Sequence, residues 1–207
     1  MDMEFIKNAF ITMFVALDPP GLIAIFLGLT AHMTRTDRKA TAYRAVVVAF
    51  GILAAAALCG QMVLELLGIT IPAFRIAGGL LLFYIAFEMV FEKREPRKSH
   101  AAEETIEHDH PKNIAVFPLA IPMMAGPGAI TATILQASNA GDNWLNQLGL
   151  IMVLAAVVAC CLVSFLLANQ MDRLLGNTGR IVLSRLLGLL LAALAIQIIG
   201  DGVLAFR

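Results

Sequence analysis

The stretch Leu17-Asp18-Pro19-Pro20-Gly21 interrupts an apolar segment, residues 5–29, that is long enough to cross a lipid bilayer. Proline cannot donate a helical hydrogen bond and aspartate is a favoured N-cap, so we expect one helix to end here and another to begin. Ala125-Gly126-Pro127-Gly128 interrupts a second apolar segment in the other half of the chain. Inside a membrane such breaks are tolerated only where the backbone is buried in protein or lines a cavity.

The composition is that of an integral membrane protein. Of the 207 residues, 59% are hydrophobic, and the mean hydropathy is +0.83, far above the values of soluble proteins. The 15 basic and 15 acidic residues balance, and no basic run is interleaved with aromatic residues, so nucleic-acid binding is not predicted. The chain has no hydrolase or phosphate-loop motif and is not predicted to be an enzyme.

Six windows of about 20 mainly apolar residues predict an all-α membrane protein with six transmembrane helices. The windows are residues 5–29, 43–67, 71–91, 113–137, 147–169 and 181–206. The first and fourth contain the interruptions and are predicted to be discontinuous. Residues 92–113 are hydrophilic and are predicted to link a first three-helix repeat, 1–91, to a second, 114–207, within a single membrane domain.

Matching motifs in the two halves predict an inverted repeat. Three spans in each half make the second half enter the membrane from the opposite side, an architecture typical of secondary transporters. Most of the basic residues flank connections on one side, so the positive-inside rule puts the 92–113 linker in the cytoplasm and both termini outside. The matching motifs are Pro20-Gly21 with Pro127-Gly128, Leu66-Leu67-Gly68 with Leu174-Leu175-Gly176, and Arg75-Ile76-Ala77-Gly78 with Arg185-Leu186-Leu187-Gly188.

The two breaks predict a substrate site near the middle of the membrane. A helix that begins there directs its free N–H groups and positive dipole end at the gap, where a carboxylate can be held, and the Asp18 side chain can meet an ammonium group. Small neighbouring residues leave room for a small zwitterion only. The predicted substrate-binding residues are Asp18, Pro19, Pro20, Gly21, Gly126, Pro127, Gly128 and Thr131.

Simpler roles stay open for these residues. Asp18 can act only as a helix cap, although a carboxyl group at mid-membrane costs about 2.5 to 3.5 kcal/mol on insertion scales and is a functional hypothesis by default. Thr131 and Thr133 can bond their own helix backbone. We assign gating or structural roles to four further residues: Arg75, Arg185, Pro118 and Pro122. For the two arginines the alternative is that their side chains snorkel to the membrane surface. Glu88 is expected to be solvated at the interface.

The cluster His100, His108, Asp109 and His110 has the residue types of a metal site, but its acidic flanks are those of a solvated linker. We therefore predict no metal and no cofactor in the protein. Coupling of transport to H⁺ or Na⁺ stays open.

Four motifs together resemble the MarC family of bacterial inner-membrane proteins over the whole chain. They are Asp18-Pro19-Pro20-Gly21, Phe74-Arg75-Ile76-Ala77-Gly78-Gly79, the stretch from Phe117-Pro118 to Ala129-Ile130, and Arg185-x-x-Gly188. The resemblance implies an inner-membrane location and membership of the LysE-type exporter superfamily, whose members move amino acids or metal ions. It also implies a likeness to archaeal transporters of glycine and alanine. Leu22-Ile23-Ala24-Ile25-Phe26 departs from the family by lacking a third proline.

The sequence thus favours a secondary transporter, an exporter of small neutral amino acids or similar small solutes, that works by alternating access. Its expected partners are the solute and the lipid bilayer, and a homo-oligomer stays open. Two alternatives remain: a non-transporting scaffold or regulatory protein acting through residues 92–113, and a metal-ion exporter.

Overall fold

The computed structural model describes residues 2–91, 114–141 and 143–206. These residues are helical throughout, with short connections and no strand, so the predicted all-α class is confirmed. The elements are α1 (Met3–Leu17), α2 (Pro19–Leu29), α3 (Arg35–Leu66), α4 (Ile71–Val90), the π-helical segment η1 (Ala115–Met124), α6 (Pro127–Ala140), α7 (Trp144–Leu166) and α8 (Ala168–Ala205). The predicted linker and its histidines lie outside the described residues.

The membrane-crossing stretches fall where hydropathy predicts them. Five stretches of the described chain are long and apolar enough to span a bilayer. η1 and α6 make a sixth if these two helices, bent by 58°, count as one span. The five are Met3–Leu29, Arg35–Leu66, Ile71–Val90, Trp144–Leu166 and Thr178–Ala205.

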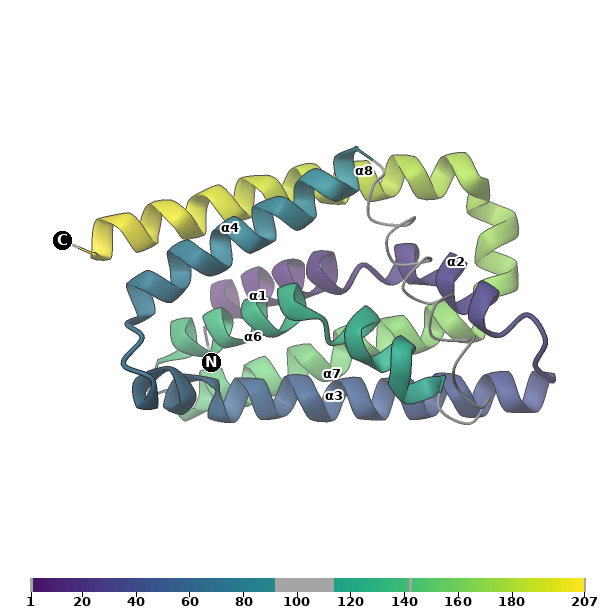
Figure 1. Ribbon diagram of the computed structural model, residues 1–207, viewed down its shortest axis with the longest axis horizontal. Coiled ribbons are helices and arrows are strands. Elements are labelled where there is room, and N and C mark those ends of the chain that lie inside the picture. The colour runs from purple at the N-terminus through teal and green to yellow at the C-terminus, as the bar shows by residue number, and fades with distance from the viewer. Residues whose placement is uncertain (1, 92–113, 142, 207) are drawn as a thin grey trace.

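The two interrupted segments occupy the middle of the bundle. In Figure 1, α4 and α8 run along one side, α3 and α7 run along the other, and α1, α2 and α6 lie between them. Contacts agree with this layering, because α1 and α2 both touch α7 and α8, and α6 touches α3 and α4. In the apolar window of Met3–Leu29, 72% of residues are buried, against 22% for Arg35–Leu66. The first segment is therefore enclosed by protein, whereas α3 presents most of its surface outward.

Helix ends differ from the predicted spans because hydropathy marks the hydrocarbon layer, not the helix. α3 begins at Arg35 instead of residue 43, since Thr34 caps it by accepting from the Asp37 N–H at 3.2 Å. α8 begins at Ala168 instead of residue 181 and is interrupted at Gly176, whose φ of 58° is left-handed. Basic residues assigned to the first connection therefore lie on the first turns of α3.

Glycines allow α4 and α8 to approach closely. A Cβ at Gly188 would lie 2.8 Å from the Met89 Cβ and 3.1 Å from the Ala86 carbonyl oxygen, and one at Gly79 would lie 2.5 Å from Cγ1 of Ile199. Without a hydrophobic driving force between helices in lipid, such small-residue contacts supply much of the packing energy. The α4–α8 pair is accordingly a rigid unit on one side of the bundle.

We expect Gly188→Ala to destabilise the protein by about 1 to 3 kcal/mol, because the Met89 Cβ cannot move aside as a flexible side-chain end can. Gly200→Ala on the same helix is the matched control, since a Cβ there meets nothing within 4 Å. Thermal unfolding in detergent measures both variants. Equal melting temperatures for the two would contradict the tight α4–α8 contact.

Candidate functional site

The first break is made by a single residue. Asp18 has φ 56° and ψ 63°, so it ends α1 in the left-handed conformation and at the same time caps α2. Its N–H donates to the Phe14 carbonyl at 3.0 Å, and its Oδ1 accepts from the Gly21 N–H at 3.2 Å. The break thus satisfies its own backbone groups locally, as a low-dielectric setting requires.

The residues after Asp18 are fixed by this cap. Proline suits the first helical position because its ring presets φ and because a first-turn N–H has no helical partner. A Cβ at Gly21 would collide with the Asp18 carboxylate, so the cap requires glycine there. Asp18 is only 2% exposed, and Pro19, Pro20 and Gly21 are buried with it. This half of the predicted site lies within the protein interior.

The second break is built differently. η1 contains Pro118 and Pro122, and the backbone is extended at the preceding residues, Phe117 and Ile121, as expected before proline. α6 begins at Pro127 after Gly126, which has no side chain to cap the first-turn N–H groups. Pro127 and Pro122 are exposed, Gly126 is half-buried, and Pro118 and Gly128 are buried. The start of α6 is therefore more open than the start of α2.

The two interrupted segments pack against each other. α1 contacts α6, and α2 contacts η1, so the part before one break lies against the part after the other. The Thr133 hydroxyl on α6 lies 3.7 Å from the sulfur of Met13 on α1. Figure 1 shows both breaks in the central part of the bundle. Segments far apart in sequence are thus brought to a similar level of the molecule.

The first turns of α6 pack against α4. A Cβ at Gly128 would meet Cδ1 of Ile85, and one at Gly78 would lie 2.5 Å from Cγ2 of Thr131. Thr131 is therefore packed against α4 at 9% exposure. The Thr133 hydroxyl donates to the Ala129 carbonyl at 2.8 Å, which is the local backbone bond that the sequence left open for it.

The predicted arginines occupy different settings. Arg75 on α4 donates from Nη2 to Oδ1 of Asn139 on α6 at 2.8 Å and so joins the two predicted repeats. Arg185 is exposed and lies well inside α8, because that helix begins earlier than predicted. The expectation of interfacial solvation for Glu88 was wrong, because this residue of α4 is only 4% exposed.

The predicted residues line neither of two cavities formed by the described residues. The larger cavity, about 940 Å³, lies at the ends of α2, α3, α7 and α8 and includes Arg35, Arg38 and Arg173. Sequence reasoning used these residues only to orient the chain, although four basic residues in ten positions, 35–44, were a signal for an anionic partner.

No group of three or more metal-ligating side chains occurs within the described residues.

A helical bundle with several bilayer-length apolar stretches defines a multi-pass integral membrane protein. The chain belongs to the family described as "MarC family integral membrane protein", whose model matches residues 3–206. No solved structure matches it significantly.

Curated relatives match along most of their length. A UPF0056 membrane protein of Archaeoglobus fulgidus is 38% identical over 97% of this chain and 92% of its own. The UPF0056 membrane protein YvbG of Bacillus subtilis is 37% identical over 98% and 95%. The UPF0056 inner membrane protein MarC of Salmonella typhimurium is 36% identical over 90% and 88%, and its name agrees with the predicted inner-membrane location.

We expect Asp18→Ala to lower the free energy of unfolding by about 2 to 4 kcal/mol, because it removes a buried cap and forces alanine into a left-handed φ. Asp18→Asn keeps the acceptor oxygen and tolerates that φ, so its loss should stay below about 1 kcal/mol. Denaturation in detergent measures both. Asp2→Ala, at the exposed cap of α1, is a control expected to cost about 0.5 to 1 kcal/mol.

Proposed function

We propose that this protein is a secondary transporter, an exporter, of small neutral amino acids or similar small solutes. The observation that carries the proposal is that the two helix breaks lie in the centre of the bundle, within apolar segments that pack against each other. Paired discontinuous helices of this kind place substrate and ion sites near the midplane in known transporter folds.

The contacts support an inverted repeat of two three-helix halves. Exchanging the halves equates α1 with η1, α2 with α6, α3 with α7 and α4 with α8. Under this exchange the contacts of α3 with η1 and α6 become those of α7 with α1 and α2, and α4–α6 becomes α8–α2, all of which occur. The α3–α7 and α4–α8 pairs map onto themselves. The exchange fails for α1–α8, α6–α7 and α7–α8, and the α1–α6 contact is more extensive than its counterpart α2–η1.

Two equivalent glycines add a local argument for the repeat. Gly68, after α3, has φ 68°, and Gly176, its predicted counterpart within α8, has φ 58°. Gly68 ends α3 with hydrogen bonds from Gly68 N–H to the Glu65 carbonyl at 3.0 Å and from Ile69 N–H to the Leu64 carbonyl at 2.9 Å. In each half of the chain, a left-handed glycine therefore precedes the last apolar span, as expected if the two halves arose by duplication.

The chemistry of the breaks suits a zwitterion. At the start of α6 no side chain caps the first-turn N–H groups, so these groups and the helix dipole favour a carboxylate. At the start of α2 the Asp18 carboxylate favours an ammonium group, and its negative charge is itself held by the α2 dipole. A glycine or alanine molecule carries both groups one carbon apart.

Transport requires the central segments to separate, because Asp18 and Gly128 are buried in this conformation. The contacts around the second break are apolar and glycine-based, as at Gly128 and Ile85, so this part of α6 can slide against α4. The Arg75–Asn139 bond at 2.8 Å is the polar tie between these helices and is assigned the gating role. Buried Asp18 and Glu88 are the carboxylates available for coupling to H⁺ or Na⁺.

The scaffold and metal-exporter alternatives receive no specific support from the described residues. The names of the matched relatives describe membrane proteins and specify no solute. The predicted cytoplasmic position of residues 92–113 and the outward termini remain part of the proposal, resting on the distribution of Lys and Arg.

The test is flux of labelled glycine and alanine into proteoliposomes, with and without a proton or sodium gradient. We expect saturable, gradient-dependent uptake that competing unlabelled alanine suppresses. Absence of saturable flux for every small zwitterion, in protein that unfolds cooperatively, would refute the proposed substrate class.

Asp18→Asn should reduce gradient-driven flux at least ten-fold while the protein keeps its melting temperature, because the amide retains the cap but cannot carry charge. Glu65→Gln, an exposed acid on α3, is the matched control and should transport normally. Unchanged kinetics in Asp18→Asn would reduce Asp18 to a structural cap.

A further inference from the structure

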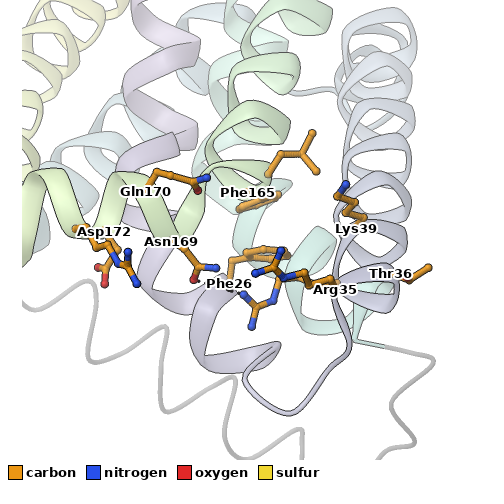
Figure 2. Close-up of a pocket in the computed structure, with 11 residues that line it drawn as sticks. Phe26, Arg35, Thr36, Lys39, Phe165, Asn169, Gln170 and Asp172 are labelled. Carbon is orange, nitrogen blue, oxygen red and sulfur yellow. Dashed lines mark hydrogen bonds between the residues drawn. The ribbon is translucent and has the colours of Figure 1, made fainter.

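A large cavity lies at one end of the bundle, away from the helix breaks. Its volume is about 940 Å³, and it is bounded by the last turn of α2, the first turns of α3, the end of α7 and the start of α8. Figure 2 shows Arg35 and Lys39 of α3 on one side, Asn169 and Gln170 of α8 on the other, and the rings of Phe26 and Phe165 between them. None of these residues belongs to the proposed transport site.

The rim of the cavity is strongly cationic. Arg35, Arg38, Lys39 and Arg173 line it, and the one acidic lining residue, Asp172, is paired with Arg180 at 3.0 Å. That pairing neutralises the only nearby negative charge among the lining residues, so four cations face a shared space. Like charges this close repel one another unless an anion lies between them.

Helix ends of both kinds meet at the cavity. Three of the four cations lie within the first five residues of α3, where the helix dipole already favours negative charge. α8 also begins at the cavity, and no side chain caps its first turn. The last turns of α2 and α7 also end at the cavity, so the dipoles of the helix ends offset one another, and the four basic side chains supply the positive charge that selects an anion.

Arg38 is held in place for such a role. Its Nη2 donates to the Thr30 carbonyl at the end of α2 at 3.1 Å, and its Nη1 lies 3.5 Å from Oδ1 of Asn169. Its Nε is buried and has no hydrogen-bond acceptor among the described residues. A buried donor without an acceptor is costly, and an anionic oxygen in the cavity would satisfy it.

The floor of the cavity is apolar. Phe26 of α2 and Phe165 of α7 stack with ring centroids 4.5 Å apart and an interplanar angle of 20°, and Leu166 lies beside them. Both rings are at most 2% exposed, so the floor is rigid. An occupant that matches the whole cavity has an anionic head and an apolar body.

We propose that this cavity binds the headgroup phosphate of an anionic phospholipid, with the glycerol and first acyl carbons against Phe26 and Phe165. The site lies where the apolar helices end in basic residues, at the headgroup level of the leaflet that the positive-inside rule makes cytoplasmic. Basic pockets between helices on that side suit lipid headgroups. A soluble phosphate would use the rim alone and leave the apolar floor unfilled.

The test uses the full chain, delipidated in a neutral detergent, and its thermal stabilisation by short-chain phosphatidylglycerol. Phosphatidylcholine of the same chain length, inorganic phosphate and glycerol phosphate are the comparison probes. We expect a saturable rise in melting temperature with phosphatidylglycerol alone, since binding to the folded form raises its stability. Equal stabilisation by phosphatidylcholine, or by the soluble phosphates, would overturn the lipid assignment.

Variants separate the cavity from general surface charge. Arg35→Gln with Lys39→Gln should weaken phosphatidylglycerol binding about 25-fold, equivalent to about 1 kcal/mol for each basic side chain. Arg44→Gln removes an exposed charge from the same helix outside the cavity and should leave the affinity unchanged. A loss for Arg44→Gln as large as for one cavity residue would overturn the proposal. Because no solute flux is measured, this result is independent of the transport proposal.

Discussion

The structure depends on keeping backbone hydrogen bonds satisfied where two helices break inside an apolar bundle. In water a broken helix end is solvated, whereas in hydrocarbon each unpaired group costs several kcal/mol. Asp18 meets this constraint in one residue, by adopting a left-handed φ and accepting from the Gly21 N–H. The second break meets it only in part: its prolines have no N–H to satisfy, whereas no side chain caps the first turn of α6.

This constraint explains the layering. A break is tolerated only when protein surrounds it, so the interrupted segments lie in the middle and the long helices α3, α4, α7 and α8 enclose them. The burial of the Met3–Leu29 window, 72%, follows from this position. The enclosing helices face lipid on their other sides, and in such a setting Gly79 and Gly188 bring α4 and α8 together by close contact.

Sequence reasoning succeeded where the signal is local. Hydropathy located the spans, and the proline and glycine stretches located the ends of α1 and the start of α6, because helix termination is decided within a few residues. It failed where the outcome depends on distant partners. Glu88 was expected at the interface because its burial arises from packing between helices, which hydropathy along the chain does not show. The apolar span Thr178–Ala205 lies close to the predicted 181–206, but the polar stretch of α8 before it was not predicted, because it extends beyond the apolar window.

The cationic cavity was not predicted for the same reason, because it is built from four helix ends that are distant in sequence. Its position nevertheless matters for the central breaks. α2 begins at Asp18 and carries Phe26, so a helix of 11 residues, about 16 Å long, touches the proposed solute site at one end and the lipid cavity at the other. If α2 moves during transport, the floor formed by Phe26 against Phe165 must move with it or unstack. A lipid that binds only the stacked arrangement stabilises the position of α2 in which Phe26 stacks on Phe165. By thermodynamic linkage, a solute that favours this same position binds more tightly when the lipid is present.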